Sequence, residues 1–397
     1  MKHSADRRIP PPVAHRRSRT LAALLAALAL CAAGCAETAR DAAWPEGALC
    51  VGRTAALRSV LEDLQRLEAT PLARAARDLA AALPACERFE SHAGSGQLQD
   101  LAASLRCGEP AGALGAVHRA LGDGDLLLAL PTASGGRARL GARVDARNIR
   151  LAVDWPDAPA DGALGLLLPG DAALGSELLS DRQRVLHLHV RPASGLDLAA
   201  LVPAHSQADR LFRLRSALFA GAALDGSWEA AVYLPEPERA MPRAALALEF
   251  GVRRAAVLGI EQFIEEIAST WPVRRSDFAL GGAPGACLLN LNILPEFAPC
   301  YVATARALVI GWNAASLASA LAEPIEPAPV PDGERAAGSA VLDFRRVRDA
   351  DALLASALGP DGLANALQLP WRRLVASGSR ADHTLRARIE IERETSP

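Results

Sequence analysis

The feature that most constrains the fold is a strict alternation of apolar and charged side chains near the end of the chain. Apolar residues occupy every second position from Leu385 to Ile391, and charged residues occupy the positions from Arg386 to Glu392 between and after them. Successive side chains of a β-strand point to opposite faces of a sheet, so this pattern predicts a strand with one buried face and one wet face. We therefore expect an antiparallel sheet that is covered on one side.

Three pairs of segments, one of which includes this alternating segment, predict β-hairpins, because each pair has strand-like sequence on both sides of a short turn. The pairs are 137–144 with 148–155, 228–234 with 244–250, and 371–377 with 383–392. Elsewhere the hydrophobic period changes from 2 to 3.6 residues, which predicts a short strand followed by an amphipathic helix. Five such units occur: 48–52 with 54–67, 185–190 with 196–201, 244–250 with 255–269, 307–312 with 314–321, and 339–344 with 349–358.

The first 35 residues have the features of a bacterial export signal. Six basic residues and one acidic residue lie within residues 1–20, and an uncharged run of leucine, alanine and one cysteine follows at 21–33. A basic segment, a short apolar segment and a small-residue cleavage site are typical of secretory signals. The apolar run is shorter than the ~20 residues that a membrane-spanning helix needs. The sequence Cys31-Ala32-Ala33-Gly34-Cys35 resembles the lipobox of bacterial lipoproteins, although that family usually has leucine where this chain has Ala32.

The lipoprotein resemblance implies cleavage before Cys35 and attachment of lipid, palmitate included, to Cys35. The residues that follow, Ala36 and Glu37, imply by the same resemblance the periplasmic side of the outer membrane of a Gram-negative cell. Two alternatives stay open. One is an ordinary signal peptide with Cys35 as a plain thiol, and the other is a twin-arginine signal at Arg16-Arg17.

The repeated units predict an α+β fold with mostly antiparallel sheets, packed helices and a helical N-terminal region, since residues 54–107 look mostly helical. Four prolines within 323–331 predict a stiff extended connector. We therefore expect five parts, namely a signal peptide at 1–34, a mostly helical region at 35–124, an α+β body at 125–322, the connector at 323–331, and a C-terminal strand-helix-hairpin unit at 332–397 that completes the body.

Composition excludes several classes of function. Lys2 is the only lysine and lies in the leader, so the rest of the chain has no lysine for a Schiff base, a pyridoxal-phosphate anchor or a P-loop. The leader also contains six of the 43 basic residues of the chain but only one of its 45 acidic residues. The remainder is therefore acidic, and we expect no nucleic-acid partner.

Five cysteines follow the predicted lipidation site, and thiols of this number in an exported protein usually pair. Cys287 and Cys300 flank a short segment that we interpret as two strands around a turn, so we predict a disulfide bond between them. Cys86 can pair with either Cys50 or Cys107, and the sequence does not decide between these two pairings.

Two histidines are the weak candidates for a metal site. His187 and His189 are two residues apart on a predicted strand, so they share a face, and His205 or Asp209 can complete a tetrahedral set. Zinc sites usually show a second clustered pair of ligands, however. Leucines and a valine form the other face of the strand, so we interpret the histidines as surface positions and predict neither a metal nor a cofactor.

No motif for nucleophilic hydrolysis is present. A hydrolase of this kind needs a serine on a sharp strand-to-helix turn, and the nearest sequences, Gly94-Ser95-Gly96 and Ser134-Gly135-Gly136, predict loops instead. The glycine-rich segment 281–285 precedes a strand rather than a helix, so it predicts a tight turn and not a phosphate site.

Residues 45–392 resemble uncharacterised bacterial envelope proteins that are built from similar strand-helix units. An example of such a unit here is Ala307-Leu308-Val309-Ile310-Gly311, which is followed by the predicted helix at 314–321. That resemblance implies no catalytic residues. We therefore expect a lipid-anchored cell-envelope protein with a non-enzymatic role in binding or assembly, attached to the membrane through Cys35 and to an envelope protein partner. The alternatives are a periplasmic carrier of an apolar ligand and a membrane-anchored hydrolase with a site built from distant residues.

Overall fold

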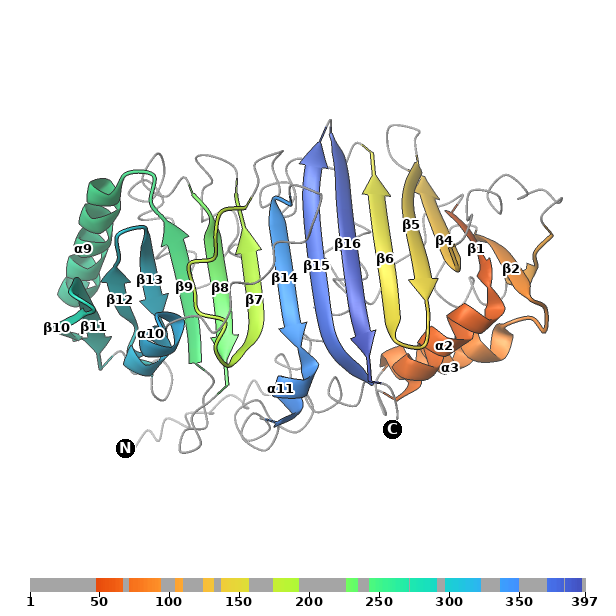
Figure 1. Ribbon diagram of the computed structural model, residues 1–397, viewed down its shortest axis with the longest axis horizontal. Coiled ribbons are helices and arrows are strands. Elements are labelled where there is room, and N and C mark those ends of the chain that lie inside the picture. The colour runs from red at the N-terminus through yellow and green to blue at the C-terminus, as the bar shows by residue number, and fades with distance from the viewer. Residues whose placement is uncertain are drawn as a thin grey trace, which may run out of the picture.

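The computed structural model describes residues 48–66, 71–93, 104–109, 124–131, 137–156, 174–192, 226–234, 243–270, 272–290, 297–322, 336–349, 370–381 and 383–394. Within these ranges, 16 strands form one continuous sheet in which every neighbouring pair is antiparallel. Figure 1 shows the strands side by side along the length of the molecule.

Residues 48–155 supply one end of the sheet. The elements are β1 (Ala48–Arg53), α2 (Thr54–Gln65), α3 (Pro71–Ala82), β2 (Arg88–Ala93), β3 (Arg106–Cys107), β4 (Leu126–Pro131), β5 (Arg137–Val144) and β6 (Asn148–Trp155). Residues 184–320 supply the other end, with β7 (Arg184–Val190), β8 (Trp228–Tyr233), β9 (Arg243–Glu249), α9 (Arg253–Thr270), β10 (Arg274–Leu280), β11 (Ala283–Leu289), β12 (Cys300–Ala303), β13 (Ala307–Gly311) and α10 (Ala314–Ala320).

The C-terminal strands join these two ends. They comprise β14 (Gly338–Asp343), β15 (Trp371–Ala381) and β16 (Thr384–Arg393), with α11 (Phe344–Asp349) after β14. The strand order is β10-β11-β12-β13-β9-β8-β7-β14-β15-β16-β6-β5-β4-β1-β2-β3. Strands β6 and β7 follow one another among the described strands but are separated in space by the last three strands of the chain, which lie between the two ends in Figure 1. Continuity of the sheet therefore depends on β14, β15 and β16.

Both edges of the sheet carry features that disfavour pairing with another chain. The edge strand β10 is exposed along most of its length and includes Arg274, Arg275 and Asp277. The opposite edge strand, β3, has only two residues, and a disulfide bond between Cys86 and Cys107 holds it. Charged and very short edge strands are common protections against edge-to-edge aggregation.

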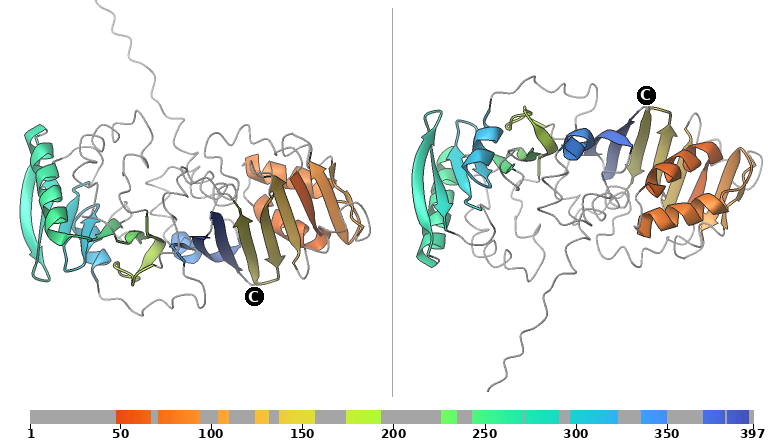
Figure 2. Two further views of the ribbon diagram at one scale, coloured as in Figure 1. Left: turned by 90° about the horizontal axis from the view of Figure 1, so that it is seen from above. Right: turned by 90° about the horizontal axis from the view of Figure 1, so that it is seen from below.

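Helices cover both faces at the β7–β13 end of the sheet. On one face, α9 contributes Ile260 and Ile264 to a core with Trp228 and Leu248. On the other face, α10 contributes Leu317 to a core that includes Ala247 and Val302. Ala247 and Leu248 are consecutive residues of β9, so the alternation of the strand buries side chains on both sides. Figure 2 shows α9 along the strands at this end.

The other half of the sheet is covered on one face by α2, α3 and α11. Ala73 from α3 and Phe344 from α11 pack with Trp371, Ile389 and other apolar residues of β6, β15 and β16. In Figure 2, α2 and α3 lie across the strands at this end. Ile389 and Ile391 are buried, whereas Arg386, Arg388 and Glu390 are exposed, as the alternation near the C-terminus predicts.

Local sequence explains the turns between several strands. Gly281 and Gly282 form the two-residue turn between β10 and β11 with φ of 58° and 79°, a left-handed conformation that glycine adopts without steric cost. In the β5–β6 turn, the Asp145 carboxylate accepts hydrogen bonds from the backbone N–H groups of Arg147 at 2.8 Å and Asn148 at 2.7 Å. Both turns match the predictions for 281–285 and 145–147.

The predicted α+β fold with packed helices is wrong. About half of the described residues are strand and about a quarter are helix, and the strands belong to one sheet. The expected helical character of 54–107 ends at Ala82, because 88–93 and 106–107 are strands that extend the sheet. Helix α11 begins at Phe344, five residues before the start of the helix that we predicted at 349–358. The predicted leader, the connector at 323–331 and the helix at 196–201 lie outside the described residues.

Two disulfide bonds are present among the described cysteines. Cys287 and Cys300 are opposite one another on β11 and β12, with their Cα atoms 4.0 Å apart. Cys86 pairs with Cys107 at a Cα separation of 5.8 Å, which decides between the two pairings that the sequence left open. Cys50 is a free thiol. Burial of its sulfur raises the pKa of Cys50 to about 12, although the residue as a whole keeps partial exposure.

Candidate functional site

The polar face of the central strands carries a hollow of about 930 Å³ over β4, β5, β6, β15 and β16. The face lies opposite the one that α2, α3 and α11 cover, because Arg150 and Arg388 alternate along their strands with the buried Ile149 and Ile389. The charged residues that line the hollow are Arg143, Arg150, Asp154, Arg373, Arg386, Arg388, Glu390 and Glu392. We call this surface the arginine face.

Positive charge dominates the arginine face. Five arginines and three acidic residues line the hollow, although the chain as a whole has a net charge of −2. Some of these charges pair with one another. Arg150 donates to Glu390 at 3.1 Å, and Arg386 lies 4.0 Å from Asp154. The excess positive charge therefore lies on the face that α10 covers at the far end of the sheet, but over strands that α10 does not contact.

Two arginines of the face are direct neighbours. Arg143 on β5 and Arg150 on β6 are opposite one another in the strand register, and both are exposed. Like charges directly opposite on neighbouring strands are destabilising. Guanidinium groups are also the side chains best suited to bind carboxylate or phosphate with two parallel hydrogen bonds. An anionic group between Arg143 and Arg150 would therefore relieve their repulsion.

A second polar cluster lies on the same side of the sheet and is buried. His187 and His189 on β7 and Glu229 on β8 are residues with exposures of 1%, 3% and 0%. Glu229 is opposite His189 in the register. On the other side, His189 is opposite Ser339 of β14, which is opposite Ser377 in the hollow. The cluster and the arginine face therefore share one face of the sheet.

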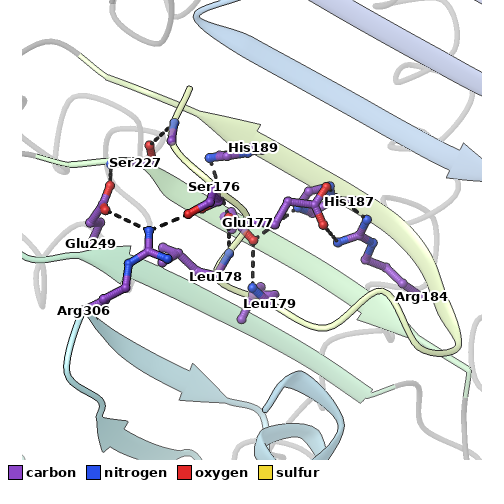
Figure 3. Close-up of polar contacts among 12 residues, drawn as sticks. Ser176, Glu177, Leu178, Leu179, Arg184, His187, His189, Ser227, Glu249 and Arg306 are labelled. Carbon is purple, nitrogen blue, oxygen red and sulfur yellow. Dashed lines mark hydrogen bonds and ion pairs between the residues drawn. The ribbon is translucent and has the colours of Figure 1, made fainter. Parts of the chain in front are cut away.

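Residues 174–180, which we call the strap, cross this face and cover the cluster (Figure 3). The Glu229 carboxylate accepts hydrogen bonds from the backbone N–H groups of Leu178 at 2.6 Å and Leu179 at 3.0 Å. The strap is also held near its ends, since Leu174 N–H donates to Ala336 O at 3.0 Å and Ser180 N–H donates to Ala320 O at 2.8 Å. Glu229 thus holds the middle of the strap on the sheet.

His187 contacts carboxylates on both ring nitrogens. Its Nε2 atom lies 3.3 Å from Glu229 Oε2, and its Nδ1 atom lies 3.8 Å from Glu177 Oε1. Glu177 also accepts a hydrogen bond from Arg184 at 2.9 Å. Figure 3 shows Glu177 on the strap between Arg184 and His187. Both ring nitrogens of His187 therefore have polar neighbours.

His189 differs, because its buried Nε2 atom has no hydrogen-bond partner among the described residues. The nearest carboxylate oxygen, Glu229 Oε1, is 3.6 Å away. Burial lowers the pKa of His189, and the negative charge of Glu229 opposes that shift only in part. The imidazole is therefore held in its neutral form, with one polar atom unsatisfied.

A further carboxylate fixes the neighbouring strand ends. Partial burial alone would raise the pKa of Glu249, but hydrogen bonds from Ser227 N–H at 2.9 Å and from Arg306 at 3.2 Å hold it below its ordinary value. Gly226 lies against this side chain, since an added Cβ would be 2.5 Å from Glu249 Cβ. Figure 3 shows Glu249, Arg306 and Ser176 of the strap in one connected group.

The interpretation of His187 and His189 as surface residues is wrong. They share a face, as the spacing predicts, but that face is buried beneath the strap, whereas Leu188 on the other face is 39% exposed. The sequence pattern shows which residues share a face and not which face is covered. His205 and Asp209, the expected additional ligands, lie outside the described residues, as does Cys35. The residue that joins the histidines is Glu229, which carries no local motif.

The hollow on the arginine face is lined by apolar residues such as Leu126, Leu151 and Val375 as well as by charged side chains. It therefore does not separate the apolar-carrier alternative from a binding role, and both stay predictions. A hydrolase needs an accessible nucleophile beside a base. His187 and Glu229 form a histidine–acid pair, but both are buried, and among the described residues no serine hydroxyl is bonded to either histidine. Both glycine–serine sequences considered above lie outside the described residues.

Comparison with protein-family models, curated proteins and solved structures finds no match. Among the described residues, no helix combines the length and apolar character needed to cross a membrane. The arginine face and the buried cluster therefore have to be interpreted from their own chemistry.

Proposed function

We propose that this chain is a lipid-anchored protein of the cell envelope that binds an anionic ligand or partner on its arginine face and has no enzymatic role. The observation that carries the proposal is the excess of arginine around an open hollow, with Arg143 directly opposite Arg150. Glu390 already offsets part of the charge of Arg150, and a bound carboxylate or phosphate group would offset the remaining repulsion.

The sheet provides a rigid support for such a surface. Arg143, Arg150, Arg373 and Arg388 come from four neighbouring strands, β5, β6, β15 and β16. Binding groups on regular strands are held more precisely than groups on loops. Binding through several fixed charges also explains how an acidic protein attracts an acidic partner, because the local potential of a face differs from that of the whole molecule.

The lipobox-like sequence that ends at Cys35 supports the anchored location. In the lipoprotein family, a lipid on this cysteine holds the mature protein at the membrane, here by proposal on the periplasmic side of the outer membrane. The partner is then an acidic envelope protein or another anionic component of the envelope.

Site-specific photo-crosslinking tests the binding face. A photo-reactive amino acid in place of Ser377, which lines the hollow, should form a discrete adduct in intact cells that make the protein. The matched control replaces Leu258 on α9, which is 54% exposed and lies on the opposite face. Equal adducts from both positions, or none from position 377, would contradict a specific role for the arginine face.

Fractionation tests the anchor separately. A Cys35→Ala variant should leave the membrane fraction and appear in the soluble fraction of the envelope, because it has no residue for the lipid to modify. If the variant partitions with membranes as the parent does, the anchor at Cys35 is wrong. This result would not affect the crosslinking experiment, so the two parts of the proposal fail independently.

A further inference from the structure

The buried cluster on β7 and β8 has the donor set of a metal site. One ligand atom from each of His187, His189 and Glu229 lies within 4.8 Å of the other two. The two oxygens of Glu229 each approach one ring: Oε2 lies 3.3 Å from His187 Nε2, and Oε1 lies 3.6 Å from His189 Nε2. Two ligands that bind one zinc ion at ~2.0–2.1 Å in tetrahedral geometry lie roughly 3.3 Å apart. The two separations between carboxylate and imidazole are therefore already close to the spacing that a shared ion requires.

The unsatisfied atom of His189 points to the same interpretation. A buried polar atom without a partner costs ~1–3 kcal/mol, and native structures leave few of them. His189 Nε2 is such an atom, and it lies on the side of the ring that approaches Glu229. A cation between the two residues supplies a partner for the nitrogen lone pair and neutralises part of the carboxylate charge.

The surroundings resemble the outer shell of known metal centres in their chemistry. Ligating histidines generally have a carboxylate or carbonyl at the second ring nitrogen, which fixes ring orientation. His187 has Glu177 at its Nδ1 atom, and Glu177 is itself bound by Arg184. The Glu229 carboxylate is fixed by the Leu178 and Leu179 N–H groups and keeps lone pairs free, because a carboxylate has about four acceptor positions.

We propose that His187, His189 and Glu229 bind one divalent transition-metal ion of the zinc type. Two imidazoles and one carboxylate are a donor set for zinc and its neighbours, whereas Ca²⁺ and Mg²⁺ prefer oxygen ligands throughout. Three protein ligands leave one position of a tetrahedral ion for water or another group. The site does not depend on the arginine face or on the lipid anchor.

Variants at His189 test the proposal most cleanly. Glu229 also holds the strap, so its removal would disturb the fold. His189 Nε2 makes no hydrogen bond among the described residues, so a His189→Leu substitution loses no hydrogen bond of that atom and replaces an unsatisfied polar group with an apolar one. Such a change is close to neutral for stability in the absence of metal.

The control is His383→Asn. His383 is exposed on the turn between β15 and β16 and has a φ of 63°, a conformation that asparagine tolerates. Purified full-length chains of the parent and both variants would be stripped with a chelator and titrated with ZnCl₂ by calorimetry. CoCl₂ titration, followed by visible absorption, reports the coordination of the ion directly.

The parent and His383→Asn should each bind one Zn²⁺ per chain, and zinc should raise the thermal unfolding midpoint of both. His189→Leu should bind zinc more than about 100-fold more weakly, above the roughly 10–100-fold loss that removal of an outer partner causes. Glu177→Gln should fall within that smaller range. If the metal-stripped parent binds no zinc or cobalt, or if His189→Leu binds as tightly as the parent, the site is a metal-free hydrogen-bond cluster and the proposal is wrong.

Discussion

Replacement of Glu229 should be the most destabilising single change at the buried cluster. Its carboxylate is completely buried and accepts hydrogen bonds from two backbone N–H groups of the strap, while His187 lies 3.3 Å away. Glu229→Ala leaves those groups without an acceptor, and each unsatisfied buried group costs ~1–3 kcal/mol. Two such groups together cost roughly 2–6 kcal/mol. We therefore expect a loss of this size in the free energy of unfolding.

Urea unfolding in a chelating buffer measures this loss without any contribution from metal. Tryptophan fluorescence is a suitable signal, because the buried Trp228 precedes Glu229 on β8. The control is Glu390→Ala, which removes an exposed partner of Arg150 and should cost at most ~1 kcal/mol. A loss below about 1 kcal/mol for Glu229→Ala, equal to that of the control, would refute the role of Glu229 in holding the strap.

Three other predictions concern the turns, the thiols and the packing of glycine. Asp145→Ala should destabilise the chain by ~0.5–1.5 kcal/mol in urea unfolding at pH 7, since two backbone hydrogen bonds are lost. Those two hydrogen bonds lower the pKa of Asp145. The stabilising effect of the carboxylate is therefore present above the ordinary carboxyl pKa of ~3.9 and is lost as the pH falls through the lowered pKa. The difference in unfolding free energy between parent and variant should accordingly shrink below about pH 4. A thiol reagent should detect one thiol, that of Cys50, per mature chain that has been denatured without reduction. In the folded chain the reagent should react slowly with Cys50, because the pKa of this thiol is about 12. Rapid labelling of the folded chain would contradict the burial of Cys50. Gly226→Ala should lower the free energy of unfolding by ~1–3 kcal/mol, because the added Cβ clashes with Glu249. Gly141→Ala should be neutral or stabilising, because an added Cβ there has no neighbour within 4 Å. Equal thermal unfolding midpoints for the two variants would contradict this packing.

Local pattern was sufficient to predict many elements of the fold. The hairpin of β5 and β6 spans the two predicted segments, and α9 and α10 lie within two residues of their predicted bounds. These features depend on neighbouring residues, whose alternation or helical spacing is visible in the chain. The pairing of Cys287 with Cys300 also follows from two cysteines on adjacent strands of one local unit.

The continuity of the sheet could not be predicted in this way. Strand β14 pairs with β7, and β16 pairs with β6, across sequence separations of more than 100 residues. Alternation indicates that each segment is a strand but contains no information about its neighbour in the sheet. For that reason the sequence suggested separate strand-helix units, although the C-terminal strands connect both ends into one sheet.

The candidate sites show the same limit. The shared face of His187 and His189 follows from their spacing, but their burial depends on the strap that precedes them. Glu229, 40 or more residues further along the chain, holds that strap on the sheet. The opposition of Arg143 and Arg150 is local to one hairpin, whereas Arg373 and Arg388 join them only through the long-range pairing of β16 with β6. A polar strand face is visible in sequence, but a charged surface built from four strands is not.

Charge reversal on the arginine face tests the central claim of anion binding most directly. A double variant, Arg143→Glu with Arg388→Glu, reverses two charges in the hollow. The matched double variant, Arg58→Glu with Arg77→Glu, makes the same change in net charge at exposed positions on α2 and α3. The measured quantity is the yield of the crosslinked adduct from position 377 in each background.

We predict that charge reversal in the hollow reduces the yield of the adduct by at least about tenfold, which corresponds to ~1.4 kcal/mol of binding free energy. The reason is that each lost ion pair and each new repulsion in a binding interface weakens association. The matched reversal on α2 and α3 should leave the yield unchanged. If both double variants retain the adduct, or if both lose it equally, the arginine face does not bind an anionic partner and the proposed function is wrong.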